Sequence, residues 1–241
     1  MLIATFIIDK PKWAKRIQKK NNKIKFDYKN TLLHDNFFKK AWTFMFLNIS
    51  MGLILIGSCA SLLKNYSCLS AGTIIIVMML CGLFNGAGRL VFPFASDFLV
   101  KRINILIIAL LMEISVIILG LIFPIFVPIS IILINAGYGC FFACLPSILH
   151  DHYGEKNLST LHGLCLSSWG CASIFAYICS SLILAYFSPV TLLIVLAIVY
   201  MINLVVVYGV NKNKSVSWWV LITTINFASI IIGSSTEDVL S

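Results

Sequence analysis

The chain has 241 residues, of which 60% are hydrophobic and only 11% are charged, and its mean hydropathy is +0.98. Soluble domains average about a quarter charged residues, and a folded chain of this size still leaves about a quarter to a third of its surface exposed. The composition therefore excludes a soluble globular domain, a disordered chain and a disulfide-rich secreted scaffold. It predicts a protein that lies in lipid.

The formal net charge of +9 is concentrated near the beginning of the chain. Eleven of the 18 Lys and Arg residues lie between Lys10 and Lys40, and the chain after Ala41 is nearly free of charge. Such a cluster beside apolar spans is typical of a cytoplasmic flanking segment, which anionic lipid headgroups also attract. No nucleic-acid recognition motif accompanies the charge, so nucleic acid is not an expected partner.

The first 40 residues divide into two predicted parts. Met1–Ile8 is apolar but too short to span a bilayer, and it lacks the charged start and cleavage site of a signal peptide. We interpret residues 1–8 as the remnant of a preceding helix. Residues 9–40 form a basic cytoplasmic linker.

Six apolar runs follow, each about as long as the 20 residues that a helix needs to cross the hydrocarbon. Lipid offers no hydrogen-bond partners to the backbone, so every span must be helical. Residues 41–210 are therefore predicted to form an all-α membrane protein, a six-transmembrane-helix bundle. The predicted spans are Ala41–Leu63, Ala71–Phe94, Ile103–Phe123, Phe126–Leu149, Leu158–Tyr186 and Val190–Val210.

The connecting segments predict the topology. With the basic linker in the cytoplasm, 16 Lys and Arg residues lie on the cytoplasmic side and only Lys64 lies on the other. Residues 211–241 form a tail in which Val216–Ile232 is an interfacial or an additional transmembrane helix. The chain is thus an integral multi-pass membrane protein, in a membrane that the sequence does not specify.

Two charged residues lie inside the spans, where a charge is costly unless it is paired or hydrated. Arg89 lies in the cytoplasmic half of the second span and Glu113 near the middle of the third. Asn85, Arg89 and Pro93 follow one another at intervals of four and share a helix face. A guanidinium on a glycine-rich face suits bidentate binding of a carboxylate. Alternatively, Arg89 extends to the cytoplasmic headgroups or balances the charge of Glu113.

The second span also carries a family resemblance. Its end, GAGRLVFPFASDFLVKR, resembles the loop signature of the major facilitator superfamily, as found in monocarboxylate and oxalate/formate antiporter-type carriers. The Gly88-Arg89 pair precedes Ser96-Asp97 and then Lys101-Arg102. Three further stretches are similar to the oxalate/formate subgroup, namely DYKNTLLHDNFFKKAWTFMFLNISMGLILI, NAGYGCFFACLPSILHDHYGEKN and LHGLCLSSWGCASIF.

This resemblance implies the C-terminal half of a carrier, with spans that correspond to helices seven to twelve of a twelve-helix fold. Arg89 matches the arginine that binds a substrate carboxylate in such carriers. Monocarboxylate carriers commonly have an acid one turn before it, where this chain has Asn85, so Glu113 is the candidate for proton coupling. The eleventh helix lacks the second cation of oxalate exchangers, which favours a monocarboxylate.

We therefore expect a transporter of a small organic anion that works by alternating access, with no enzymatic activity and no cofactor. Its partners would be the anion, the bilayer, and either a missing N-terminal six-helix bundle or a second copy. The alternative is a non-transporting truncated carrier or a membrane subunit that needs a partner bundle. The predicted substrate-binding residues are Arg89, Asn85, Trp169 and Ser167, the charge-balancing or coupling residue is Glu113, and the conformational latch loop contains Ser96, Asp97, Lys101 and Arg102.

Other polar and aromatic side chains are weaker candidates. Tyr138 and Asn135 could face a cavity, although such residues at helical spacing more often pack in the core. His150 and His152 flank Asp151, but side chains two residues apart point to different faces of a helix. We therefore expect no metal site.

Overall fold

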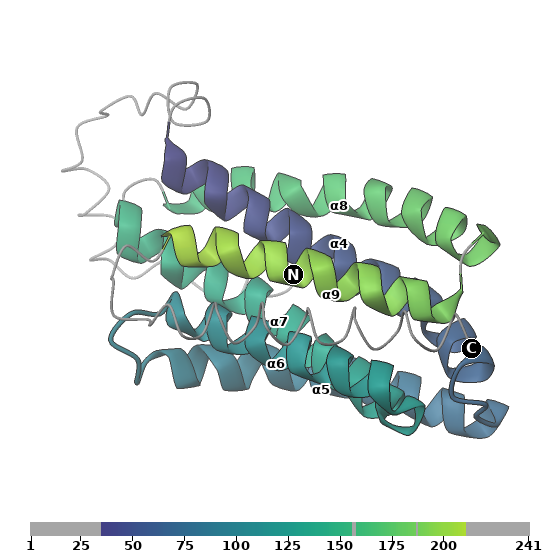
Figure 1. Cartoon of the computed structure of the whole chain (residues 1–241). Helices are drawn as coiled ribbons and strands as arrows, with labels where there is room; N and C mark the ends of the chain where they lie inside the picture. Colours follow the sequence, from purple (N-terminus) through teal and green to yellow (C-terminus); the bar gives the residue numbers. More distant parts are fainter. Residues whose placement is uncertain (1–34, 156–157, 187, 211–241) are drawn as a thin grey trace, which may run out of the picture. The chain divides into compact units, whose positions relative to one another are not determined.

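The computed structural model in Figure 1 describes residues 35–155, 158–186 and 188–210. These ranges contain helices and no strand, and six of the helices are long and apolar enough to cross a membrane. The predicted all-α six-helix bundle is thereby confirmed. The predicted helix remnant, the linker up to residue 34, and the tail from residue 211 with its candidate helix lie outside the described residues.

The elements are α4 (Asn36–Asn65), α5 (Ala71–Ser96), α6 (Asn104–Ile122), the 3-10 turn η1 (Pro124–Phe126), α7 (Val127–Tyr153), α8 (Leu158–Tyr186) and α9 (Pro189–Val210).

Two helices extend by four or more residues at one end beyond the apolar runs that predicted them. Helix α4 begins at Asn36 rather than Ala41, because the Asp35 carboxylate accepts hydrogen bonds from the first free backbone amides of the helix. Helix α7 continues to Tyr153 and ends where Gly154 adopts a φ of 70°, a conformation that glycine reaches without strain. Both extensions lie at the predicted cytoplasmic end, where polar helix ends reach the headgroup layer.

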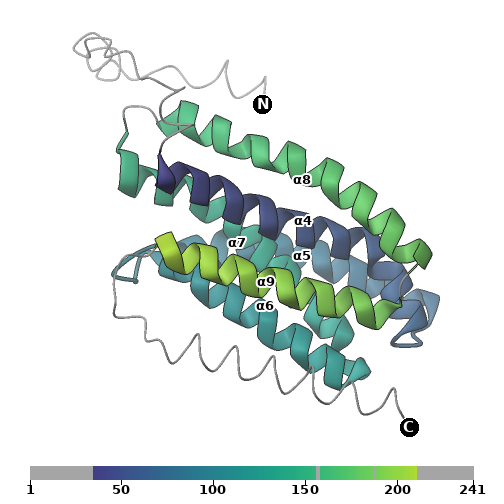
Figure 2. The same cartoon turned by 45° about the horizontal axis from the view of Figure 1, so that its top comes forward.

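The bundle consists of two sets of three helices, α4–α6 and α7–α9. Each helix of one set has the same kind of neighbours as the corresponding helix of the other set. Helix α4 packs against α8 and α9, whereas α7 packs against α5 and α6, and the pairs α4–α7 and α6–α9 close the bundle. Exchanging α4–α6 with α7–α9 converts the pair α4–α8 into α5–α7 and the pair α4–α9 into α6–α7, and it leaves the pairs α4–α7 and α6–α9 unchanged. Because α4 and α7 are three spans apart, they run in opposite directions, so the two sets are related as inverted repeats. Figure 2 shows α8 lying along α4 and α9 lying along α6.

Burial is unevenly distributed among the helices. In 18-residue apolar stretches, 61% of the residues are buried in α4 and in the segment of η1 and α7, against 22% in α5 and in α8. The core therefore lies between α4, α6, α7 and α9, where Tyr200, Phe44 and Phe141 are fully buried. Helices α5 and α8 leave large apolar side chains uncovered.

Asp35 joins the beginning of α4 to the end of α7. Its Oδ1 accepts from the Phe37 backbone amide at 2.8 Å, and its Oδ2 accepts from the Tyr153 hydroxyl at 2.7 Å. We expect Asp35→Ala to lower the free energy of unfolding by about 1 kcal/mol through the lost cap. Asp35→Ser, which retains a capping oxygen, and Tyr153→Phe should each cost less. Thermal unfolding in detergent measures the series, and an unchanged midpoint for Asp35→Ala would contradict it.

Candidate functional site

Arg89 lies on an exposed face of α5, about 10 Å from the helix end at Ser96 for a rise of 1.5 Å per residue. Its Nε donates to Asn85 Oδ1 at 3.1 Å, and its guanidinium carbon lies 5.3 Å from the centre of the Phe142 ring. Asn85 precedes Arg89 by one turn, so the Arg89 side chain points away from the nearer end of α5, which is the predicted cytoplasmic end. This orientation is opposite to the one that Arg89 would need to reach the headgroups.

Close contact between α5 and α7 sets the position of Arg89. A Cβ atom at Gly88 would overlap the carbonyl group of Ala136, and one at Gly139 would overlap the Asn85 carbonyl oxygen and touch Arg89. The two helix backbones can therefore approach each other only because both positions are glycine. This approach brings the Arg89 side chain to the Phe142 ring on α7.

Aromatic side chains continue the site from α7 to α8. The Phe142 ring meets the Trp169 ring edge-to-face at a centroid distance of 5.8 Å, and Tyr138 lies 5.3 Å from Phe142. Trp169 is 49% exposed, whereas Tyr138 is buried over Gly52. The predicted residues Asn85, Arg89 and Trp169 thus lie along one surface, connected by Phe142. The sequence analysis did not single out Phe142.

Ser167 has a different environment. Its hydroxyl accepts from Trp42 Nε1 at 3.0 Å and donates to the Leu164 carbonyl at 2.7 Å. Both functions of the hydroxyl are therefore in use, and the residue connects α8 to α4.

Glu113 is fully buried in the core of the bundle, away from Arg89. Asn48 Nδ2 donates to its two carboxyl oxygens at 3.1 and 3.3 Å, and the carboxyl group fills the space over Gly137. Within the described ranges, no ion pair joins Glu113 to Arg89. Glu113 lies on the α6 face that packs against α4 and α7, whereas Arg89 lies on an outer face of α5. Glu113 and Arg89 are therefore not paired in this structure, and a charge-balancing or coupling role for Glu113 stays a prediction.

Two further polar groups lie in this part of the core. Tyr200 on α9 is fully buried, as Glu113 is. The Tyr200 hydroxyl and Asn48 Oδ1 both lack a hydrogen-bond partner within the described ranges. The sequence analysis missed Asn48 and Tyr200. An asparagine inside an apolar span was the available signal for Asn48, because polar groups at that depth face the protein interior.

The predicted latch loop is held by contacts within the bundle. Arg102 binds Asp97 of its own loop at 3.2 Å and Asp151 at the end of α7 at 3.1 Å. The Ser96 hydroxyl is buried and donates to the Pro93 carbonyl at 2.6 Å. The loop therefore ties the junction of α5 and α6 to α7. Lys101 lines a neighbouring cavity.

The weaker candidates occupy ordinary structural positions. Asn135 is buried and its amide donates to the Ile131 carbonyl one turn earlier. His152 stacks on Phe37 with a centroid distance of 3.7 Å, and His150 lies 3.8 Å from Asp151. In the described part of the chain, no three His, Cys, Asp or Glu side chains group closely enough to hold a metal ion.

Together these features define a class: a helical membrane bundle, built from two inverted three-helix sets, with one arginine on an exposed surface within a span and one carboxyl group in its core. No protein-family model, no curated protein and no solved structure matches the chain. The resemblance to major facilitator superfamily carriers therefore remains a prediction from the residues themselves.

Proposed function

We propose that the bundle is one half of a carrier of the major facilitator type, an antiporter or symporter for a small monocarboxylate, and that Arg89 binds the carboxylate. The orientation of Arg89 carries this proposal. Its side chain points toward the middle of the bilayer and contacts Asn85 and Phe142, with no acidic partner in the described ranges. A guanidinium at that depth needs an anion or water, and a transported carboxylate supplies the anion.

The neighbours of Arg89 suit a small organic anion. Asn85 accepts from Arg89 through Oδ1, which leaves its amide nitrogen to donate to a second substrate oxygen. Phe142 and Trp169 provide an apolar wall for the carbon skeleton. Ser167 would act indirectly by holding Trp42 against α8. Arg89 is the one Lys or Arg in the middle of the described spans, which favours one carboxylate over two.

The arrangement of helices also supports a carrier. Inverted three-helix repeats are the elements from which facilitator-type halves are built, and substrate binds between two such halves. The uncovered faces of α5 and α8 lie next to Arg89 and Trp169. A second bundle, either an N-terminal half or another copy of this chain, would cover them and enclose the anion.

A binding experiment on the purified full chain tests the proposal. Monocarboxylates such as lactate and formate should stabilise it against thermal unfolding, by about 2.7 kcal/mol at a hundred times the dissociation constant. Lactamide, the uncharged analogue of lactate, should give no stabilisation. Uptake of the stabilising anion into proteoliposomes then tests transport. Equal stabilisation by lactate and lactamide would rule out recognition of a carboxylate.

We further propose that Glu113 is the group that couples transport to protons. It is a buried carboxyl whose hydrogen-bond partner in the described ranges is the neutral amide of Asn48, so it can gain or lose a proton without breaking an ion pair. Glu113→Gln keeps the size and the hydrogen bond but removes the titration. We expect the variant to exchange anions across the membrane but to lose accumulation driven by a pH gradient. Unchanged accumulation would contradict this role.

The alternative, a membrane subunit that does not transport, rests on the same uncovered apolar faces of α5 and α8. They fit a partner bundle of any kind. Carboxylate binding distinguishes the two, because a purely structural subunit has no reason to recognise lactate over lactamide.

A further inference from the structure

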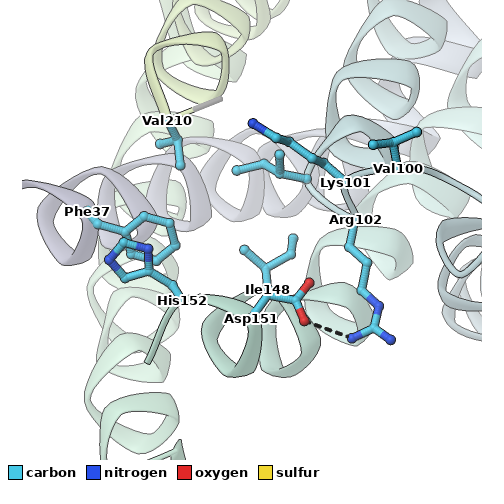
Figure 3. A pocket seen from close by; sticks show the side chains of 9 residues that line it. Phe37, Val100, Lys101, Arg102, Ile148, Asp151, His152 and Val210 are labelled. Atoms are coloured by element: carbon cyan, nitrogen blue, oxygen red, sulfur yellow. Dashed lines mark hydrogen bonds and ion pairs between the residues drawn. The ribbon is translucent and has the colours of Figure 1, made fainter. Parts of the chain in front are cut away.

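Two adjoining cavities open at the predicted cytoplasmic end of the bundle (Figure 3). Their volumes are about 340 Å³ and about 400 Å³, and they share Phe37, Lys101, His152 and Val210. Their walls come from the beginning of α4, the loop between α5 and α6, and the ends of α7 and α9. The combined cavity therefore lies where the ends of three helices meet the loop between α5 and α6.

Cations outnumber acids by one in the lining of this cavity. Lys40, Lys101 and Arg102 line it, together with His152. Two acids also line it, but each has protein partners: Asp35 accepts from Tyr153 and from the α4 backbone, and Asp151 accepts from Arg102. Lys40 Nζ donates to the Gly209 carbonyl at 2.8 Å, which uses one of its three hydrogens. Arg102 is already paired with Asp97 and Asp151, so Lys40 and Lys101 are the cations that an anion in the cavity would meet.

The remaining wall is apolar and lies at the predicted cytoplasmic end of the bundle. Val100, Ile103, Ile148 and Val210 line the cavity, and Val100 is 96% exposed. Figure 3 shows Lys101 extending toward Val210, while Arg102 turns to Asp151. A ligand with a negatively charged group attached to hydrocarbon fits this cavity better than a free ion does. Its charged group can contact the cations and its hydrocarbon can contact the apolar wall.

We propose that this cavity binds the phosphate of an acidic phospholipid headgroup, with Lys40 and Lys101 as the principal cations. Basic pockets between transmembrane helices on the cytoplasmic side are suited to such headgroups. The bound lipid would join the ends of α4, α7 and α9 to the loop between α5 and α6. This site is separate from Arg89, so the proposal does not depend on the transport function.

Native mass spectrometry of the purified full chain tests the site with short-chain phosphatidylglycerol and phosphatidylcholine as probes. The anionic lipid should bind more tightly, and Lys40→Ala and Lys101→Ala should each weaken it about fivefold. Lys39→Ala is the matched control, because this exposed neighbour has the same charge and does not line the cavity. Val210→Trp should also weaken binding, since it fills the cavity without changing the charge.

The outcomes separate a built site from diffuse attraction. Equal losses for Lys39→Ala, Lys40→Ala and Lys101→Ala, with no effect of Val210→Trp, would overturn the proposal. Inorganic phosphate provides the second arm. If it competes with phosphatidylglycerol only at far higher concentration, the lipid assignment is supported; if it binds as tightly as the lipid, that assignment is wrong.

Discussion

Gly88→Leu is expected to prevent the bundle from packing, and Gly88→Ala to lower the free energy of unfolding by about 1–3 kcal/mol. The obstacle to any side chain at this position is the Ala136 carbonyl on α7. Backbone atoms cannot rotate away as a side chain can, so α5 and α7 must separate. Because Arg89 is the next residue, the same displacement would draw its guanidinium away from Phe142.

Gly86→Ala provides the matched control on the same helix. No atom outside its own helical surroundings lies within 4 Å of the position that a Cβ would take there. Since alanine favours a helix by about 1 kcal/mol over glycine, this variant should unfold at the same temperature as the parent or slightly higher. The eight free cysteines, five of them buried, allow a thiol-reactive dye to follow unfolding. Identical curves for Gly86→Ala and Gly88→Ala would show that the close contact has no energetic role.

Arg89→Ala should weaken carboxylate binding about 10- to 100-fold, the range that corresponds to losing a hydrogen bond to a charged group. Arg89→Lys should recover only part of the affinity, because an ammonium group lacks the planar pair of donors that matches a carboxylate. Stabilisation by lactate against thermal unfolding measures both variants. Because the side chain is exposed, neither substitution should unfold the protein.

Lys64→Ala is the control for this series, since it removes one positive charge at the other end of the bundle. It should leave lactate binding unchanged. Trp169→Ala should raise the dissociation constant less than Arg89→Ala does, through loss of the apolar wall. If lactate stabilises Arg89→Ala as strongly as it stabilises the parent chain, Arg89 is not the carboxylate-binding residue.

Hydropathy was sufficient to place the six spans, because lipid requires a long apolar helix for each crossing. It was less informative about their ends. The beginning of α4 contains Lys39 and Lys40, which an apolar window excludes, although the Asp35 cap starts the helix before them. Polar caps and headgroup-level turns leave no hydropathy signal. The sequence also did not predict the packing of α4 against α8, since it depends on the side-chain shapes of two helices that are far apart in the sequence.

For the candidate site, the sequence predicted which side chains are neighbours on the same helix. It did not predict which side chains meet between helices. The interval of four residues correctly placed Asn85 beside Arg89. The same reasoning could not say which neighbour Glu113 faces, because the rotation of α6 against α4 and α7 is a property of the packed bundle. Glu113 therefore has Asn48 as its partner, and Arg89 has Phe142.

The pairing of α4 with α8 has a consequence for the synthesis and membrane insertion of the protein. About 100 residues separate the end of α4 at Asn65 from the beginning of α8 at Leu158. At a synthesis rate of about 5–20 residues per second, the ribosome needs roughly 5–20 s to make them. During that interval α4 is already inserted while its largest partner does not yet exist. Its packing surface must meanwhile be shielded by lipid, by the insertion machinery, or by the helices that emerge before α8.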